Sequence, residues 1–211
     1  MNVTVFGATG GIGRHVVDQL LDAGHHVTVY ARNPRKIEPS KPHRIIVGQL
    51  NDRDQIADAI EGSDAVISAL GPSLKRSTPA GPLTEGTHLI VDAMHQKGVR
   101  RFIGLATPSL RDPRDGRHWK HTVLPIMAGV AFPNALKELK GMTSSVTDSR
   151  LDYTIARITN PTDKPATGKI RSGFLGRDKV GSSMSRAEIA AFLVSQLTDD
   201  RYLRAMPAIS N

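Results

Sequence analysis

The stretch Val3–Gly24, VTVFGATGGIGRHVVDQLLDAG, decides the fold, because four glycines fall within seven positions between an apolar run and a helical pattern. The apolar run is rich in β-branched residues, as a buried strand is, and it ends at Gly7. After the glycines, apolar side chains recur at helical spacing on one face. They are Ile12, Val16, Val17, Leu20 and Leu21. Gly24 stands where a glycine commonly ends a helix. We therefore predict a strand, a glycine turn and an α-helix.

Strand and helix patterns alternate along the rest of the chain. Five further β-branched runs are HVTVYAR, HRIIVG, DAVISALG, RRFIGLAT and LDYTIARI, and TGKIRSGFLG is a candidate extra strand. Helical patterns occur at DRDQIADAIEG and TEGTHLIVDAMHQKG, and Ser185 with Glu188 forms a capping box that starts a late helix. This predicts one α/β domain over residues 1–211: a doubly wound parallel sheet of the Rossmann type, with helices on both faces. Residues 159–211 form a small C-terminal region on the predicted substrate side.

Composition narrows the possible partners. The net charge of +8 fits a solvated basic surface, a phosphorylated small ligand or a nucleic acid. The basic residues are dispersed without a separate helix-turn-helix pattern, so we expect no nucleic-acid partner. With no cysteine there is no thiolate chemistry, and the eight histidines lack metal-ligand spacing, so no metal is expected. No window holds the roughly 18 apolar residues of a membrane span, which favours a cytoplasmic protein without a membrane partner.

The glycine turn predicts a dinucleotide site. In the spacing G-x-x-G-x-x-G, a turn between strand and helix lets the free N–H groups at the helix N-terminus face a pyrophosphate. We expect Gly10 to adopt a positive φ there. A tight strand-to-helix turn without a ligand is the alternative. The predicted cofactor contacts in this turn are Gly7, Thr9, Gly10, Gly11, Ile12 and Gly13.

The end of the second strand predicts which dinucleotide binds. An acidic residue there holds the ribose of NAD, whereas a cation suits the 2′-phosphate of NADP. This chain presents Arg32 and Arg35 with no carboxylate before Glu38, which favours NADP(H) over NAD(H). Further cofactor contacts are expected outside the carboxyl ends of the following strands. They are Gln49, Leu50, Ala69, Leu70, Gly71 and Thr107.

The stretches VFGATGGIGRHVVDQLLDAGHHVTVYARNP, GSDAVISALGP, GVRRFIGLAT and LDYTIARI resemble the atypical short-chain dehydrogenase/reductases. That NAD(P)H-binding group includes flavin reductase/biliverdin-IXβ reductase and regulators of nitrogen metabolite repression. The resemblance implies the Rossmann-type fold and the cofactor but not the substrate. It places Thr107 where the family has a serine beside the nicotinamide. Gly48-Gln49 replaces the usual Gly-Asp, and Arg157, where the family often has Arg-Pro, is assigned to the cofactor site.

The predicted reaction follows from a motif that is absent. Typical short-chain enzymes protonate an alkoxide with the tyrosine of Tyr-x-x-x-Lys, and none of Tyr30, Tyr153 and Tyr202 stands in such a motif. A planar flavin, quinone or tetrapyrrole spreads the charge of a hydride over its conjugated system and does not need that acid. We therefore predict an NADPH-dependent reductase of a planar conjugated acceptor. The alternative is a non-catalytic NAD(P) sensor that acts through a protein partner.

The substrate side is predicted from the long connection over residues 108–133, which we interpret as a loop or lid. Within it Trp119 could stack on the acceptor, Ser109 could contact it, and His118 could relay a proton. Thr107 is the other predicted catalytic residue, through a positioning hydrogen bond. The structural alternatives are that Thr107 satisfies backbone groups and that His118 lies on a solvated loop. The expected assembly is a monomer or a homodimer.

Overall fold

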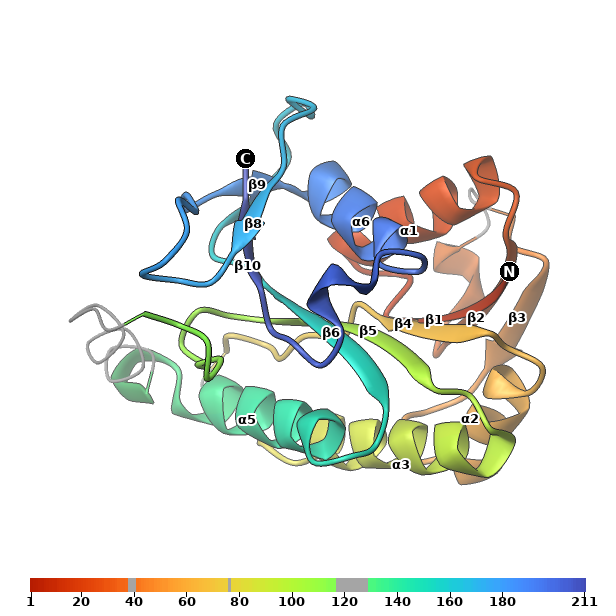
Figure 1. Ribbon diagram of the computed structural model, residues 1–211. Coiled ribbons are helices and arrows are strands. Elements are labelled where there is room, and N and C mark those ends of the chain that lie inside the picture. The colour runs from red at the N-terminus through yellow and green to blue at the C-terminus, as the bar shows by residue number, and fades with distance from the viewer. Residues whose placement is uncertain (38–40, 76, 117–128) are drawn as a thin grey trace.

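The computed structural model describes residues 1–37, 41–75, 77–116 and 129–211 of the chain (Figure 1). Eight strands form the main sheet. They are β1 (Asn2–Phe6), β2 (His26–Ala31), β3 (Arg44–Val47), β4 (Ala65–Ser68), β5 (Arg101–Ala106), β6 (Asp152–Arg157), β8 (Arg171–Gly173) and β10 (Ala208–Ser210). Their order in space is β3-β2-β1-β4-β5-β6-β10-β8, and every pairing is parallel except that of β8 with β10. The order of the first six strands is that of the Rossmann fold.

Helices cover both faces of this sheet. They are α1 (Gly11–Asp22), α2 (Arg53–Ile60), α3 (Pro82–Lys97), α5 (Pro133–Thr147) and α6 (Arg186–Ser195), with short 3-10 turns η1 (Pro34–Lys36) and η2 (Asp200–Tyr202). In Figure 1, α1 and α6 lie side by side on one face, and α2, α3 and α5 lie on the other. Each face has its own apolar cluster, so the sheet is buried on both sides, as a parallel sheet must be. The predicted doubly wound α/β fold is confirmed.

Local signals explain where several elements begin and end. Gly24 follows α1 with φ +76°, and Gly98 follows α3 with φ +73°, a conformation that only glycine adopts without strain. At the start of α6 the Ser185 hydroxyl accepts a hydrogen bond from the Glu188 N–H at 3.2 Å and donates to its carboxylate at 2.7 Å. The predicted helix start and the serine cap are therefore confirmed, with the Glu188 carboxylate bonded to the Ser185 hydroxyl.

The C-terminal region departs from the expected pattern in its detail. The strand expected within residues 167–176 is β8, and it joins the sheet antiparallel to β10. A separate two-stranded sheet consists of β7 (Pro161–Thr162) and β9 (Met184–Ser185). Strands of two or three residues carry no readable periodicity, which explains why β7, β9 and β10 were missed.

The topology brings several strand ends together at one edge. β1 pairs with β2 on one side and with β4 on the other, so the direction of winding reverses between β1 and β4. Ligands of open α/β sheets bind in the crevice outside the carboxyl ends at such a switch point. Among the described residues, no helix combines the length and the apolar character needed to cross a membrane.

Candidate dinucleotide-binding site

The glycine turn folds tightly against the end of β4. Gly7 has φ +78°, and a Cβ there would lie 2.7 Å from the carbonyl carbon of Ala69. A Cβ on Gly13 would collide with the Gly7 carbonyl oxygen, which accepts a hydrogen bond from the Gly10 N–H at 3.0 Å. The expectation of a positive φ at Gly10 is wrong, because Gly10 has φ −78° and the left-handed residue is Gly7. The glycines therefore serve the close packing of turn, helix and strand.

The N-terminus of α1 is left open by its own sequence. Gly10 occupies the N-cap position and offers no side chain, and the first turn of the helix contains no acidic residue. The first N–H groups of a helix need partners, and the helix dipole favours an anion beside them. A pyrophosphate fits this turn for both reasons.

A pocket of about 430 Å³ follows the carboxyl ends of β1, β2 and β4. It brings together many of the predicted cofactor residues. These are Gly7, Thr9, Arg32, Gln49, Leu50, Leu70 and Gly71. It also has lining residues that the sequence did not single out, namely Phe6, Tyr30, Ala31, Gly48, Asn51, Pro82, Leu83 and Glu85. Six predicted residues are not among those that line it: Gly10, Gly11, Ile12 and Gly13 at the start of α1, Arg35 in η1 and Ala69 after β4.

Tyr30 shapes the floor of this pocket. Its hydroxyl donates a hydrogen bond of 2.7 Å to the carbonyl oxygen of Gln49, and a Cβ on Gly48 would collide with that hydroxyl. Burial, aided by the nearby charge of Asp52, raises the pKa of Tyr30 to about 12. The phenol therefore stays protonated at neutral pH and holds the turn after β3 in place.

The basic residues after β2 are available to a ligand. Arg32 directly follows the strand, is exposed and lines the pocket. Within the part of the chain that the structure describes, no ion pair or side-chain hydrogen bond occupies its guanidinium group. Arg35 lies in η1 and is also exposed, but outside the pocket lining. Glu85, at the start of α3, is the acidic residue on the wall of this pocket.

At the end of β5, Thr107 and Ser109 are half-buried neighbours. Their hydroxyl oxygens lie 2.6 Å apart in a hydrogen bond that either residue can donate. Neither residue lines the pocket of about 430 Å³. His118 and Trp119 lie outside the described residues. The structure thus places Thr107 and Ser109 together at the carboxyl edge of the sheet.

The structure gives Arg157 a different role from the predicted one. Its side chain is 0% exposed, and its two terminal nitrogens bind the Asp115 carboxylate at 2.6 and 2.7 Å. It also donates to the Leu110 carbonyl oxygen at 3.1 Å. No surface of Arg157 remains for a cofactor, so its assignment to the cofactor site is corrected to a buried ion pair.

The same ion pair fixes the beginning of the predicted lid. Asp115 accepts a further hydrogen bond from the Leu175 N–H at 2.9 Å, and Asp112 accepts one from the Met206 N–H at 2.7 Å. Leu110, Asp112 and Asp115 are all buried. Residues 108–116 are therefore fastened to β6 and to the C-terminal region, while α5 occupies the chain from Pro133 onward. The central part of the predicted lid, residues 117–128, lies outside the described residues.

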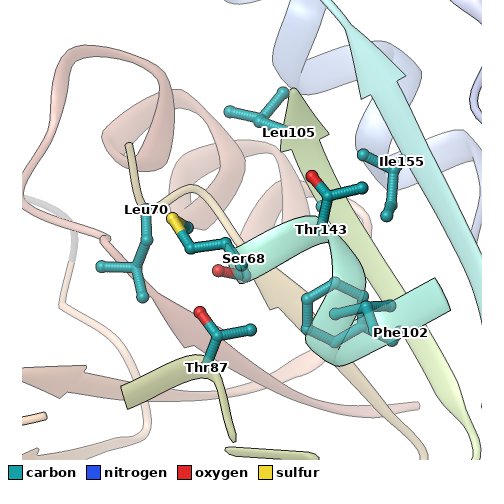
Figure 2. Close-up of a pocket in the computed structure, with 10 residues that line it drawn as sticks. Ser68, Leu70, Thr87, Phe102, Leu105, Thr143 and Ile155 are labelled. Carbon is teal, nitrogen blue, oxygen red and sulfur yellow. The ribbon is translucent and has the colours of Figure 1, made fainter. Parts of the chain in front are cut away.

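Figure 2 shows a second cavity, between the sheet and helices α3 and α5. Ser68 of β4, Thr87 of α3, Phe102 of β5 and Thr143 of α5 all line it. Its volume is about 20 Å³, which is room for about one water molecule. This cavity is too small for a planar acceptor.

A family model described as NAD(P)H-binding matches residues 7–200. The chain belongs to this NAD(P)H-binding family. The predicted resemblance is confirmed at this level. Across residues 1–37, 41–75, 77–116 and 129–211 of this NAD(P)H-binding protein, no cluster of three or more potential metal-ligating side chains occurs.

Among curated proteins, this NAD(P)H-binding protein is similar to the photosystem II assembly factor Ycf39 of Synechocystis. The two are 27% identical over 166 residues, which cover 75% of this chain and 44% of that protein. The chain spans less than two thirds of the length of the first curated relatives it matches.

Two solved structures share the fold of this NAD(P)H-binding protein. ChuY of Escherichia coli O157:H7, described as an anaerobilin reductase, superposes with a TM-score of 0.79 at 20% identity and covers 100% of this chain and 97% of its own. A short-chain dehydrogenase/reductase from Veillonella parvula, solved in complex with NADP, has a TM-score of 0.78 at 19% identity. The match covers 100% of this chain and 94% of the Veillonella chain.

Proposed function

We propose that this protein is an NADPH-dependent oxidoreductase that passes hydride to a planar conjugated acceptor. The observation that carries the proposal is the uncapped glycine turn of α1 beside a pocket lined by Arg32, at the switch point of the sheet. Membership of the NAD(P)H-binding family supports the cofactor, and ChuY and the Veillonella protein are a reductase and an NADP complex on the same fold. NADPH, when bound, supplies the hydride.

The acceptor class is argued from the tyrosines. The Tyr30 hydroxyl is bonded to the Gln49 carbonyl oxygen, and the Tyr202 hydroxyl donates to the Ser172 hydroxyl at 3.0 Å. Tyr153 lies within β6, and burial raises its pKa. None of these phenols stands in Tyr-x-x-x-Lys, so an alkoxide formed from a simple carbonyl would lack its usual proton donor. Flavins, quinones and tetrapyrroles avoid that need.

The test of this function is oxidation of NADPH by the purified protein across flavins, quinones, tetrapyrroles and simple carbonyls, followed by nicotinamide absorbance. Turnover with a planar acceptor and none with simple carbonyls is expected. Tight NADPH binding without turnover on any acceptor would overturn the reductase proposal. That result would favour the second candidate, a redox sensor acting through a protein partner, which the missing Tyr-x-x-x-Lys also fits.

Arg32 is proposed to hold the 2′-phosphate of NADPH. Loss of a charge-assisted hydrogen bond costs about 1.5–3 kcal/mol, so Arg32→Ala should weaken NADPH binding at least about tenfold and leave NADH binding nearly unchanged. Fluorescence titration of both cofactors measures this. Arg44→Ala, which removes an exposed arginine on β3 that is paired with Asp58, is the control and should change neither affinity. Equal affinity of the wild type for NADPH and NADH would contradict the preference.

Thr107 is proposed to position the nicotinamide through its hydroxyl group. Thr107→Val removes that hydroxyl at nearly constant volume and should lower kcat about ten- to a hundredfold, because a misplaced reactant loses its productive geometry. NADPH affinity should change little. Thr107→Ser is the matched control, since it keeps the hydroxyl beside Ser109. An unchanged kcat in the valine variant would mean that Thr107 only bonds to Ser109.

Four further expectations stay predictions. They are the proton relay by His118, the stacking of Trp119 on the acceptor, the assembly as a monomer or homodimer, and the cytoplasmic location.

A further inference from the structure

Arg186 is the first residue of α6, and its side chain lies across the glycine turn of α1. A Cβ on Gly11 would approach both the Cδ and the Nε of Arg186 to 2.9 Å. The absence of a side chain at Gly11 therefore leaves room for the arginine beside it. Figure 1 shows why the contact is possible: α1 and α6 pack side by side on one face of the sheet.

The position of Arg186 is not explained by α6 itself. The N-terminus of a helix favours negative charge, so an arginine at the first position opposes the helix dipole. The N–H group of Glu188 already has an acceptor in the Ser185 hydroxyl, which caps α6, and Glu188 adds the favourable negative charge in the first turn. A positive charge at this point contributes nothing to the start of α6.

In the structure Arg186 is paired with Asp163, which would compete only weakly with a bound phosphate group. Its Nη1 atom lies 2.6 Å from the Oδ1 of Asp163, in the loop after β7. The side chain of Asp163 is 86% exposed, and that of Arg186 is 27% exposed. The carboxylate of this pair is open to water, and ion pairs at a solvent-exposed surface contribute about 0–1 kcal/mol, so a phosphate group can replace the carboxylate at little cost.

We propose that Arg186 is a second cationic anchor for the dinucleotide and binds its pyrophosphate at the glycine turn. A guanidinium group binds phosphate oxygens through paired, charge-assisted hydrogen bonds. Arg186 adds a guanidinium group to the uncapped backbone N–H groups at the start of α1. This inference rests on the proposed function, since it assumes that the turn binds a dinucleotide.

In this proposal Arg32 and Arg186 contact different phosphate groups of the dinucleotide. Arg32, directly after β2, lies at the end of the pocket that suits the adenosine 2′-phosphate, whereas Arg186 reaches the turn from α6. Arg32 therefore discriminates NADPH from NADH, and Arg186 strengthens the binding of both. Asp163 holds the guanidinium near the turn when no anion is bound.

The test is a set of binding titrations of the full chain by isothermal calorimetry. Arg186→Gln should weaken NADPH, NADH and 2′-phospho-ADP-ribose, which lacks the nicotinamide, to the same extent, by about ten- to a hundredfold. The affinity for 2′,5′-ADP, which has no pyrophosphate, should fall less. Arg186→Lys should give an intermediate loss, because its ammonium group cannot form the paired contact.

A change at Asp163 separates this proposal from a merely structural role. Asp163→Asn removes the competing carboxylate and should tighten NADPH binding about twofold or more, opposite in sign to Arg186→Gln. Arg201→Gln is the charge-matched control, since it also neutralises an exposed arginine, paired with Asp199 at 3.6 Å in η2. It should leave the affinity unchanged.

The outcomes distinguish this inference from the proposed function. If the wild type binds NADPH and Arg186→Gln, still folded by circular dichroism, binds it equally well, the Arg186 proposal fails and the proposed function stands. If Arg186→Gln leaves NADPH affinity intact but raises KM for the acceptor, the residue belongs to the acceptor and the proposal also fails. If the wild type binds no dinucleotide, both the Arg186 proposal and the proposed function are wrong.

Discussion

Replacing Asp115 by alanine is expected to lower the free energy of unfolding by about 3–5 kcal/mol, because it leaves a buried guanidinium group without its counter-charge. Arg157 is 0% exposed and Asp115 is 1% exposed, and two hydrogen bonds of 2.6 and 2.7 Å join them. Among the described residues, the buried Nε of Arg157 has no hydrogen-bond partner. The variant would also deprive the Leu175 N–H of its acceptor.

Urea unfolding followed by circular dichroism measures this loss. Asp58→Ala is the control, because it breaks an ion pair of similar length, 2.7 Å to Arg44, whose side chains are 43% and 45% exposed. Such an exposed pair is worth about 0–1 kcal/mol. Equal losses in the two variants would show that the Asp115 pair is no stronger than a surface contact and would contradict its burial.

The same pair makes stability depend on pH. Burial alone would raise the pKa of Asp115, but hydrogen bonds from Arg157 and its positive charge outweigh this and hold the pKa below the ordinary value of 3.8. A carboxyl whose pKa is lower in the folded protein contributes its stabilisation above its unfolded pKa and loses it as pH falls through the folded value. The contribution of Asp115 should therefore be complete above about pH 5 and fade in stronger acid.

The ion pair between Asp115 and Arg157 is a contact that could not be predicted from the sequence. Strands β1 to β6 and helices α1 to α3 could be predicted because their signals are local: apolar periodicity and glycines at their ends. The start of α6 was likewise predicted from the local Ser185-x-x-Glu188 pattern. Asp115 and Arg157 are separated by 42 residues, and no local pattern pairs them. A basic residue at the end of a predicted strand was therefore assigned to the ligand, although the fold buries it.

A helix cap supplied by a residue distant in sequence is equally hard to predict. The N-terminus of α3 has a glycine at its N-cap position and no side chain of its own to cap it. Its acceptor comes from Glu138 of α5, whose carboxylate accepts hydrogen bonds from the N–H groups of Gly81, Leu83 and Thr84. This cap could not be predicted, because nothing near Glu138 in the sequence indicates the helix that it caps.

The candidate site was predictable in its glycine turn and in Arg32 for a different reason: both belong to one contiguous strand-turn-helix-strand unit. Arg186 is far from that unit in sequence. It reaches Gly11 only because α6 packs beside α1 once the sheet has formed. Site residues supplied by a distant element thus become visible only from the tertiary structure.

Gly10→Val is expected to reduce NADPH affinity at least about a hundredfold while the protein stays folded. Gly10 has φ −78° and ψ 168°, an extended conformation that valine adopts readily. Its Cβ would meet the Gly7 carbonyl oxygen at 3.3 Å and, apart from its chain neighbours, no other atom of the described residues within 4 Å. The branched side chain can therefore be accommodated by a small shift, and because Gly10 is exposed, its methyl groups would take up solvent space at the start of α1. That space is where a pyrophosphate would contact the free N–H groups.

Equilibrium titration with NADPH, together with circular dichroism and a thermal melt, separates loss of binding from loss of structure. Gly10→Ala is the matched control: it introduces the same Cβ contact with Gly7 but no γ-methyl groups, so its affinity should fall much less. A graded loss from alanine to valine follows only if the ligand approaches this face of the turn. Full binding by a folded valine variant would mean that the glycines serve solely the packing of Gly7 and Gly13 against β4 and α1, and that the dinucleotide, if bound, lies elsewhere.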